Sequence, residues 1–502
     1  MGRYAIGLDN GGTVIKAALF DMAGREIAAA SRQTPILTPK PGYTERDMEY
    51  LWLCNCECVK EVIDKTQIDA GEIIGIAVCG HGKGLYPWGR NGKPAWNGIV
   101  STDGRAWEYP KKWKEDGTHA KIYPRTCQDI MACQQVSLLA WFKDHHRDVY
   151  DNIQWVFSVK DYIRFRLTGE AFCEATDISG SGLMDVKNAK FDRELLDELG
   201  IGEVYEKLAP LKYSYEKCGS ITAEAARLTG LLEGTPAAGG MFDIDSCAIA
   251  LNVSTPEDMC TIAGTWSINE YISKQPVMDG SIAMNSLYAI PGYYLVEECS
   301  ATSAGNLEWY IEQCMRNEPI PPGESIYEVI NRQVEEVAPE ECEVYFLPFL
   351  YASNAHPLGK GTFAGLTLYH KKAHMLRAIY EGVVYSHKTH IDKLLSTRKL
   401  PKAVRMAGGA VNSKVWVQMF ADILDLPIET VTVKELGALG CAMAAAVAAG
   451  VYADYEEAAA RMVHIADKVY PNPEVTGVYQ NKYQKYRNLS QSLDAVWDQF
   501  TV

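Results

Sequence analysis

The start of the chain alternates short apolar runs with turns that contain glycine. Apolar residues dominate Tyr4–Leu8 and Val14–Phe20, and an extended pattern resumes at Glu26–Ala30. The first two runs are joined by Asn10-Gly11-Gly12-Thr13, and the next turn ends in Gly24. Because glycine reaches the positive φ that a tight reversal requires, the pattern predicts three antiparallel strands in a meander.

The turn Asn10–Thr13 has two interpretations. Adjacent glycines let backbone N–H groups approach an anion closely, and Thr13 adds a hydroxyl, so the turn suits a phosphate. Asp9, at the end of the preceding strand, suits Mg²⁺, held directly or through water. The spacing differs from GxxxxGK[ST] and from GxGxxG, and the residues that follow favour a strand rather than a helix. The turn is therefore either a phosphate-binding hairpin or an ordinary tight turn.

A second hairpin of the same kind occurs in the later half of the chain. Met259–Ala263 predicts a short strand, Gly264-Thr265 a tight turn, and Trp266–Ile272 an outgoing strand. The recurrence of strand, glycine–threonine turn and strand indicates an internal duplication. It favours the phosphate-binding interpretation of the first hairpin, and it predicts that two such hairpins clamp a polyphosphate across a cleft between two domains.

Two polar loops and one acidic stretch are candidates for substrate binding. A buried strand is predicted to end in Gly80-His81-Gly82-Lys83-Gly84, whose glycines have no side chains that would block the approach of a ligand. His81 and Lys83 are therefore expected to face a small polar ligand; the alternative is a flexible loop with solvated side chains. Ser101–Arg105 offers an Asp and an Arg at close range, and the strand-like run Met241–Asp245 ends in two carboxylates.

Periodicity predicts several further elements. Asp47–Lys65 has apolar residues at helical spacing, and the β-branched run Ile73–Val78 predicts a buried strand. The longest uncharged run, between Glu435 and Asp454, is mostly Ala and Gly, which favours a tightly packed internal helix that ends near Gly450 over a membrane span. Shorter helices are predicted at Ser137–His145, Asp161–Leu167, Phe191–Leu199 and Thr222–Leu228.

Length and composition narrow the class of protein. A chain of 502 residues exceeds the size of one hydrophobic core, so two or more domains are expected. Its 49 Lys and Arg against 64 Asp and Glu give a net charge of −15, which argues against nucleic acids and membranes as partners. The first apolar run is broken at Asp9, so no signal peptide is expected, and the 14 scattered cysteines suggest reduced thiols in a cytoplasmic protein.

One motif is specific enough to indicate a family. Gly361-Thr362-Phe363-Ala364-Gly365-Leu366 is followed, after seven residues, by His374-Met375-Leu376-Arg377-Ala378-Ile379-Tyr380-Glu381. With this motif the chain resembles, over essentially its whole length, the FGGY carbohydrate kinases, which are members of the actin-like ATPase superfamily. Supporting motifs are Pro41–Glu45, Gly169, Asp177, Thr229–Leu231, Gly234–Pro236, Gly408–Ser413, Trp416, Gln418 and Ala421–Asp422.

The resemblance implies an α/β fold of two duplicated RNase H-like domains, as in the actin-like ATPases. Each domain is expected to hold a mixed five-stranded sheet flanked by helices, with a cleft between the two. Residues 1–246 are expected to form the N-terminal domain, with the first phosphate hairpin and the sugar side of the site. Residues 247–502 are expected to form the C-terminal domain, with the second hairpin and the adenosine site, and the last helix is expected to pack back on the first domain.

The resemblance also implies roles for individual residues. Asp243 corresponds to the catalytic base, and Asp9 and Asp243 are the expected Mg²⁺ ligands. Asp245 is the reserve candidate for the base, because it would project to the same face of a strand. The residues expected to bind the sugar are His81, Lys83, Asp103 and Asp243. The residues expected to bind ATP are Gly11, Gly12, Thr13, Gly264, Thr265, Gly305, Gly408, Gly409, Ala410, Asn412 and Ser413.

The substrate is suggested by departures from other members of the family. Gly80–Gly84, the turn Gly264-Thr265-Trp266 and the segment Phe349–Ala355 are most similar to those of L-xylulose kinases. We therefore expect ATP-dependent transfer of the γ-phosphate to the primary hydroxyl of a ketopentose, with L-xylulose preferred. The alternatives are D-xylulose, ribulose or a polyol such as glycerol or erythritol, and, in another class, a non-catalytic actin-like ATP switch. A homodimer is expected by analogy with the family.

Overall fold

The computed structural model describes residues 3–353 and 355–500, and it separates into two compact units. Asn354, within the segment Phe349–Ala355, lies outside the described residues. The units are not the two contiguous parts 1–246 and 247–502, because later segments fold onto the first unit. Unit 1 comprises Met1–Ser254, Ile272–Val296 and Val433–His464, and unit 2 comprises Thr255–Tyr271, Glu297–Thr432 and Ile465–Val502.

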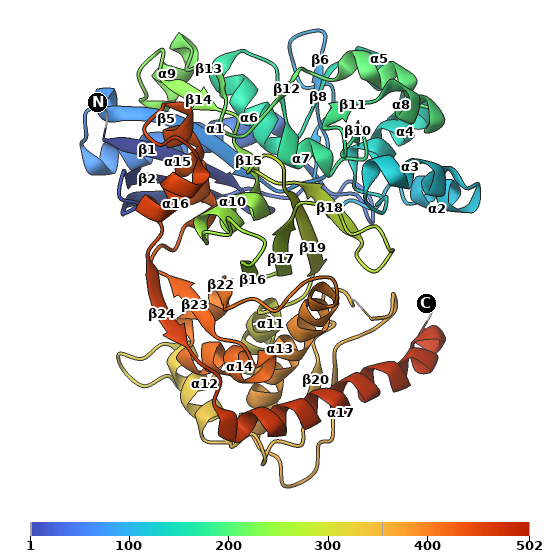
Figure 1. The fold of residues 1–502 in the computed structure, drawn as a ribbon, viewed down its shortest axis with the longest axis vertical. Helices are drawn as coiled ribbons and strands as arrows, with labels where there is room; N and C mark the ends of the chain where they lie inside the picture. The colour runs from blue at the N-terminus through green and yellow to red at the C-terminus, as the bar shows by residue number, and fades with distance from the viewer. Residues whose placement is uncertain (1–2, 354, 501–502) are drawn as a thin grey trace. The chain divides into compact units, whose positions relative to one another are not determined.

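The main sheet of unit 1 contains the predicted meander (Figure 1). Antiparallel pairing places Asp9 opposite Lys16, and parallel pairing places Asp9 opposite Cys79. The strand order is β13-β14-β5-β1-β2-β3, and β15 also pairs with β5. The bounds are β1 Tyr4–Asn10, β2 Val14–Asp21, β3 Glu26–Gln33, β5 Ile73–Gly80, β13 Lys217–Ser220, β14 Pro236–Ala238 and β15 Met241–Phe242.

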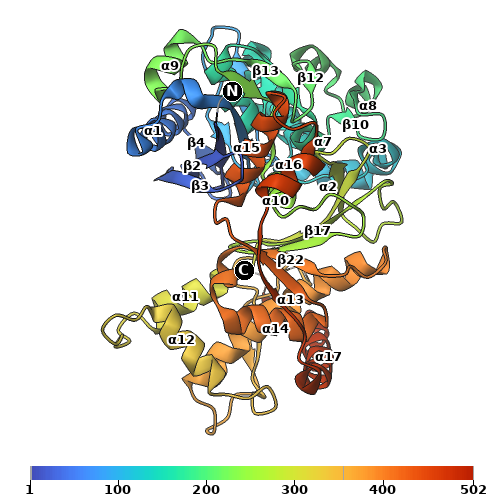
Figure 2. The same ribbon diagram turned by 60° about the vertical axis from the view of Figure 1, so that its left-hand side comes forward.

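Helices cover both faces of this sheet, α1 (Met48–Thr66) on one and α15 (Leu436–Ala448) on the other (Figure 2). Successive residues of a strand point to opposite faces, so Gly7 of β1 faces α15 while Leu8 faces α1. A Cβ added at Gly7 would lie 1.8 Å from the backbone oxygen of Ala438, so the close approach of α15 requires glycine there. The alanine- and glycine-rich helix expected between Glu435 and Gly450 is confirmed as α15.

The helix predicted over Asp47–Lys65 is confirmed as α1, whose bounds differ by one residue at each end and which is capped by Asp47. The other elements of unit 1 follow the sequence pattern in most places. The helices are α2 Glu108–Glu115, α3 Thr118–Thr126, α4 Gln135–His145, α5 Arg147–Asn152, α6 Val159–Thr168, α7 Ala175–Ser179, α8 Arg193–Glu198, α9 Ala223–Thr229, α10 Asp243–Ala250 and α16 Tyr455–Met462. The short strands are β4 Glu45–Arg46, β6 Tyr86–Gly89, β7 Gly98–Ile99, β8 Ile153–Phe157, β9 Cys173–Glu174, β10 Met184–Asp185, β11 Lys190–Phe191, β12 Leu211–Lys212 and β18 Met284–Leu287.

A second seven-stranded sheet contains the second hairpin. Its order is β18-β19-β17-β16-β22-β23-β24. Both sheets thus have seven strands instead of the five expected, because several strands of two to five residues are too short to leave a periodic signal in the sequence. The bounds are β16 Met259–Ala263, β17 Ser267–Ser273, β19 Tyr294–Ser300, β22 Val404–Ala407, β23 Ile428–Val431 and β24 Ile465–Val469; β20 Tyr345–Leu347 pairs with β21 Thr362–Ala364.

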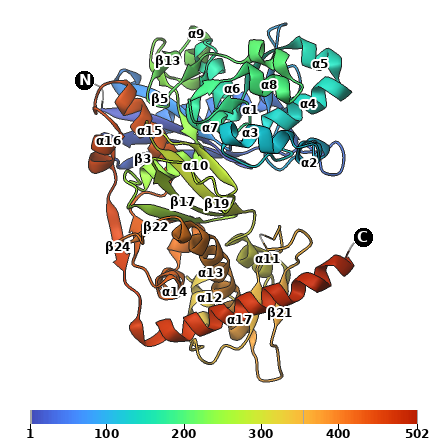
Figure 3. The same ribbon diagram turned by 45° about the vertical axis from the view of Figure 1, so that its right-hand side comes forward.

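The last helix, α17 (Pro473–Trp497), belongs to unit 2 and packs on α13 (Lys372–Ser396) and α14 (Lys414–Leu424) (Figure 3). The expectation placed it against the first domain, whereas its apolar face, with Tyr479, Tyr483 and Tyr486, is buried within unit 2. Unit 2 also contains α11 Gly305–Cys314, α12 Ile326–Glu335 and the 3₁₀ turns η3 Gly409–Asn412 and η4 Asp498–Phe500. Within the described ranges, no helix is both long and apolar enough to cross a membrane.

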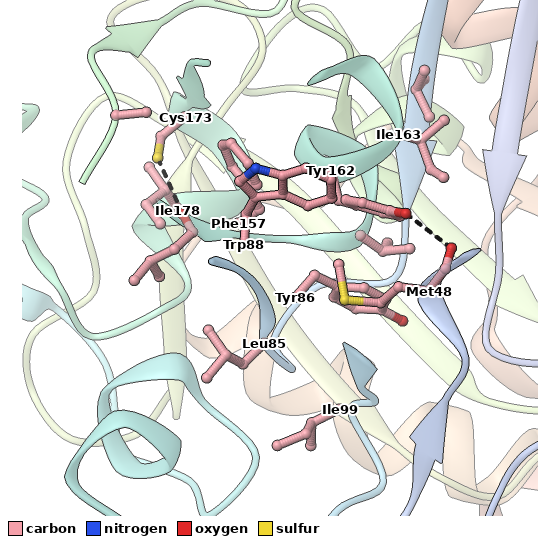
Figure 4. Close-up of a cluster of buried hydrophobic side chains, with 14 of the residues drawn as sticks. Met48, Leu85, Tyr86, Trp88, Ile99, Phe157, Tyr162, Ile163, Cys173 and Ile178 are labelled. Carbon is pink, nitrogen blue, oxygen red and sulfur yellow. Dashed lines mark hydrogen bonds between the residues drawn. The ribbon is translucent and has the colours of Figure 1, made fainter. Parts of the chain in front are cut away.

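The hydrophobic core of unit 1 supports the predicted substrate loops. Figure 4 shows Tyr86 among buried side chains that include Leu85, Ile99 and Tyr162. The rings of Tyr86 and Tyr162 stack with their centroids 6.3 Å apart, and the Tyr162 hydroxyl donates a hydrogen bond to the backbone oxygen of Met48 at 2.9 Å. The strand β6, which follows the loop Gly80–Gly84, is therefore fixed to the interior.

Candidate active site

The first hairpin turn is anchored to α1 from the inside of unit 1. Asn10 and Asn55 are both buried and exchange two side-chain hydrogen bonds, at 3.0 and 2.8 Å. Beyond Asn10 the turn becomes accessible, and a Cβ added at Gly12 would meet nothing within 4 Å. Gly11, Gly12 and Thr13 thus offer their backbone from a rigid base, which is the arrangement that anion binding by backbone N–H groups requires.

Asp9 is a half-buried residue whose carboxylate has unmet hydrogen-bonding capacity. Its Oδ1 has no hydrogen-bond partner among the residues described. Burial raises the pKa of Asp9 to about 6, and the nearby Lys16 opposes that shift. The Lys16 ammonium lies 2.8 Å from the Glu435 carboxylate, and Gly437 leaves room beside Asp9, since a Cβ there would lie 2.5 Å from Oδ2. A carboxylate oxygen with an open lone pair is a ligand that suits Mg²⁺.

The loop after β5 is fixed in place rather than flexible. The backbone N–H of His81 donates to the oxygen of Asn10 at 3.0 Å, which ties the loop to the first hairpin. His81 is 5% exposed, and its ring lies with Nε2 2.9 Å from the Tyr86 hydroxyl and Nδ1 3.3 Å from the oxygen of Gly82. Burial, helped by the nearby Arg46 charge, lowers the pKa of His81 to about 3, so the ring is neutral. Lys83 adopts a φ of 63°.

Strand pairing brings Asp243 to this loop. In the parallel pair of β15 and β5, Phe242 lies opposite Gly80, so Asp243 follows at the level of His81. A Cβ added at Gly82 would lie 2.4 Å from the ring of Phe242, which shows how closely the two segments approach. Asp243 begins α10, so its backbone lies at the end of β15, next to the loop Gly80–Gly84.

The relation between Asp243 and Asp245 differs from the expectation. The run was predicted to be a strand up to Asp245, but the strand ends at Phe242 and both carboxylates lie in the first turn of α10. Side chains two residues apart on a helix point in directions about 200° apart, so Asp243 and Asp245 do not share a face. Asp245 is fully buried, and its Oδ1 accepts a hydrogen bond from the backbone N–H of Ala289 at 3.1 Å.

Asp103 lies in an ionic network of the protein itself. Its Oδ1 accepts from the backbone N–H and Nε of Arg105, both at 2.9 Å, and its Oδ2 accepts from Nη2 of Arg105 at 2.8 Å and from the backbone N–H of Thr44 at 2.7 Å. The same Nη2 donates to Glu45 at 2.8 Å. The Asp and Arg expected at close range are therefore paired, and the network fixes the loop Ser101–Arg105.

Unit 2 brings the second hairpin together with the predicted nucleotide segments. β16 and β22 are parallel, with Ile262 opposite Ala407, so Gly408 follows beside Ala263. Gly408 has a φ of 92°, and a Cβ there would lie 2.5 Å from the Ala263 backbone, so this approach requires glycine. Gly305 opens α11, and a Cβ added there would lie 3.8 Å from the Cα of Thr265.

The segment after Gly408 is stabilised by local hydrogen bonds. Asn412 Nδ2 donates to the oxygen of Gly409 at 3.1 Å, and the Ser413 hydroxyl caps α14 by accepting from the N–H of Trp416 at 3.2 Å. Ala410 is fully buried, whereas a Cβ added at Gly409 would meet nothing within 4 Å. The second hairpin, Gly305 and Gly408–Ser413 thus form one cluster within unit 2.

Sequence reasoning missed three residues that support these sites. Thr176 accepts the backbone N–H of Phe242 at 2.9 Å and donates to Glu174 at 2.7 Å, so it positions the start of Asp243's helix. Arg46 donates to the oxygen of Gly11 at 3.1 Å. His387 is the buried centre of a hydrogen-bond network at the second hairpin. Burial and long-range pairing distinguish these residues, and neither leaves a local signal in the sequence.

Comparison with known proteins defines first the class of enzyme and then the family. A crystal structure of a ligand-bound xylulose kinase from Lactobacillus acidophilus is similar with a TM-score of 0.90 and 26% identity, and the match covers 99% of this chain and 100% of that one. Together with the glycine hairpins, this defines an ATP-dependent sugar kinase of duplicated actin-like fold. The chain belongs to the FGGY family of carbohydrate kinases, whose N-terminal domain matches residues 4–250 and whose C-terminal domain matches residues 259–449.

Two curated relatives are similar over nearly their whole lengths. An L-xylulose/3-keto-L-gulonate kinase of Escherichia coli (strain K12) is 38% identical, and the match covers 98% of this chain and 98% of the relative. A probable L-xylulose kinase of Pasteurella multocida (strain Pm70) is 35% identical, with coverage of 98% and 100%. Membership of a sugar kinase family is the point on which all these similarities agree.

Proposed function

We propose that this sugar kinase transfers the γ-phosphate of ATP to the primary hydroxyl of L-xylulose, giving L-xylulose 5-phosphate. The observation that carries the proposal is the pairing of β15 with β5, which sets Asp243 beside the loop of His81 and Lys83. A carboxylate next to a polar loop suits a reaction in which a hydroxyl loses a proton. The choice of L-xylulose rests on the relatives, which are named as kinases of that sugar.

Asp243 is proposed as the general base. Phosphoryl transfer has a loose transition state, so the protein mainly positions the groups and neutralises charge. Asp243 would accept the proton of the primary hydroxyl as the oxygen attacks the γ-phosphorus. The Glu174–Thr176–Phe242 chain of hydrogen bonds would hold the start of α10 in place during that step.

Lys83 is proposed as the residue of the loop that binds the sugar directly. His81 and Asp103 already use their polar atoms on Tyr86, Gly82, Arg105 and Thr44, so their part would be to fix the two loops around the sugar. Direct contacts of His81 and Asp103 with a sugar hydroxyl stay a prediction. A site that pairs each hydroxyl rejects the wrong epimer, because buried groups are then left unpaired.

The nucleotide is proposed to bind through both glycine hairpins. Gly11, Gly12, Thr13, Gly264 and Thr265 would donate backbone and hydroxyl hydrogen bonds to phosphate oxygens, and Gly305 and Gly408–Ser413 would contact the rest of ATP. Mg²⁺ would neutralise the phosphate charge when bound, and Asp9 would hold it, with Asp243 near the transferred group. A homodimer and a cytoplasmic location stay predictions.

A screen of ADP release tests the substrate. The purified protein is given ATP and Mg²⁺ with L-xylulose, D-xylulose, L-ribulose, D-ribulose, glycerol or erythritol, and with no sugar. We expect the highest kcat/KM with L-xylulose and little ADP without sugar. A higher value with another sugar would move the assignment to that sugar. Equal ADP release with and without every sugar would instead favour an ATP switch.

A further inference from the structure

Arg46 is a buried guanidinium without a counter-charge in the described part of the chain. It is 1% exposed, its Nη1 donates a hydrogen bond to the oxygen of Gly11 at 3.1 Å, and its charge opposes the rise that burial causes in the pKa of the nearby Tyr86. Its Nε and Nη2 are buried without a hydrogen-bond partner among the described residues. Within those same ranges, no carboxylate oxygen lies within 4.0 Å of its nitrogens, the limit for an ion pair.

Other buried arginines in the chain are paired. Arg105 lies 2.8 Å from Asp103, Arg164 lies 2.8 Å from Asp161, and Arg377 lies 2.8 Å from Glu381. A buried charge that lacks a counter-ion and keeps unpaired N–H groups destabilises the fold, so its retention points to a ligand. The unused Nε–H and Nη2–H groups form the planar fork that binds two oxygens of an anion.

Arg46 lies between the two parts of the active site in unit 1. On one side it contacts Gly11 of the phosphate hairpin. On the other, β4 pairs with β7 so that Arg46 lies opposite Gly98, and Gly98 is so close to Tyr86 that a Cβ would lie 2.3 Å from its ring. Tyr86 in turn contacts His81 of the substrate loop. Arg46 also lines a cavity of about 160 Å³ with Thr34 and Leu37, while its Nε and Nη2 atoms are themselves buried.

We propose that Arg46 binds the transferring phosphoryl group, in the last stage of ATP binding and in the sugar phosphate product. The inference rests on the proposed function, since it assumes that the phosphoryl group passes between Gly11 and the loop of His81. The carboxylate of a sugar acid could also accept two hydrogen bonds from the Arg46 guanidinium. The contact with Gly11 favours the phosphoryl group, because Gly11 belongs to the hairpin proposed to hold phosphates.

The test compares Arg46→Gln and Arg46→Lys with wild type. Arg32→Gln is the control, because it removes a positive charge from β3 of the same unit, where Arg32 pairs with the partly exposed Glu61. The first readout is the thermal midpoint of the ligand-free protein. The second is the shift of that midpoint on adding inorganic phosphate, L-xylulose 5-phosphate or D-gluconate. The third is kcat and KM with ATP and the best sugar from the substrate screen.

The proposal predicts opposite effects on stability and function. Arg46→Gln should keep or raise the ligand-free thermal midpoint and lose the shift caused by phosphate and sugar phosphate. It should also lower kcat by roughly 100-fold, the lower end of the effect of removing one hydrogen-bond donor to a transition-state oxygen. Arg46→Lys should keep the charge and recover part of kcat, and Arg32→Gln should match wild type.

Three outcomes would overturn the proposal. A lower midpoint of Arg46→Gln without loss of the phosphate shift would make Arg46 a structural residue. Loss of the gluconate shift alone would make it a carboxylate-binding residue. Unchanged kcat with unchanged shifts would remove it from the site. Because the phosphate shift needs no turnover, it separates a failure of this proposal from a failure of the substrate assignment, which the screen on wild-type protein reports.

Discussion

At the scale of single residues, three carboxylates of the proposed site differ in their surroundings. Asp243 begins a helix beside the substrate loop, Asp245 is buried and bonded to a backbone N–H, and Asp9 keeps an open oxygen. Residue type and spacing alone left Asp243 and Asp245 as alternatives. The helix that begins at Asp243 separates them, because it turns the two side chains apart.

Exchanging Asp243 and Asp245 for asparagine tests this separation. Asp243→Asn should lower kcat roughly 100- to 10,000-fold, the usual contribution of a general base, while ATP binding stays close to wild type. Asp245→Asn should lower the thermal midpoint, because the amide is a poorer acceptor for the Ala289 N–H, and leave the kcat of the folded protein nearly unchanged. Kinetics and calorimetry on both variants check this. Normal turnover of Asp243→Asn with an inactive Asp245→Asn would assign the base to Asp245.

Asp9 predicts a pH dependence of stability with a definite sign. Its folded pKa of about 6 lies above the ordinary 3.8 because burial disfavours the charged form. Stability is therefore lost as pH rises from about 4 to 6, and above pH 6 the buried charge costs about 3 kcal/mol. Asp9→Asn should raise the thermal midpoint at pH 8 and much less at pH 5, while it abolishes activity if Asp9 holds Mg²⁺.

Calorimetry at the two pH values measures the effect, with Asp64→Asn as an exposed control. The side chain of Asp64 is 62% exposed, so its substitution should change the midpoint equally little at both. A gain for Asp9→Asn that is the same at pH 5 and pH 8 would contradict the burial argument. In the wild type, more Mg²⁺ should be needed for half-maximal activity as pH drops through about 6, because protonation of Asp9 then competes with metal binding.

At the scale of elements, the second hairpin is held by one buried histidine of α13. His387 is fully buried, with Nδ1 3.0 Å from the Ser267 hydroxyl and 2.9 Å from Asn269 Oδ1, and Nε2 2.7 Å from the Ser303 hydroxyl. The amide oxygen can only accept, so Nδ1 carries the proton and Nε2 accepts from Ser303. Burial lowers the pKa of His387 to about 3, which keeps this neutral form. The ring thereby joins β17, α13 and the segment that leads into α11.

Replacing His387 with leucine should therefore disturb nucleotide binding. The hydrogen bonds at both ends of the ring are lost, so we expect the KM for ATP to rise by about tenfold or more while the KM for the sugar changes little. His390→Gln is the matched control, because His390 lies one helical turn further and bonds Glu298 and Ser300 instead. Equal effects of the two substitutions on the KM for ATP would indicate a general loss of stability rather than a role at the hairpin.

At the scale of the whole molecule, sequence reasoning identified what is local and missed what long-range pairing decides. The two hairpins and the helix after Asp47 follow from turn chemistry and periodicity. The neighbourhood of Asp243 and His81 depends on β15 pairing with β5, which no local pattern reports. The sequence gives no local signal for the burial of Arg46 and His387. It gives equally little signal for the strands of two to five residues that enlarge both sheets. One motif was enough to indicate the family over the whole chain, but no sequence pattern predicted that each unit is built from non-contiguous segments.

The return of α15 to unit 1 has a consequence for synthesis on the ribosome. The strand β1 is made long before α15, whose Ala438 and Gly437 lie against Gly7 and Asp9 of β1. The unit that begins the chain is therefore completed only after most of the other has been made. Until then, part of its sheet faces solvent, and a nascent chain in that state is a natural client for chaperones.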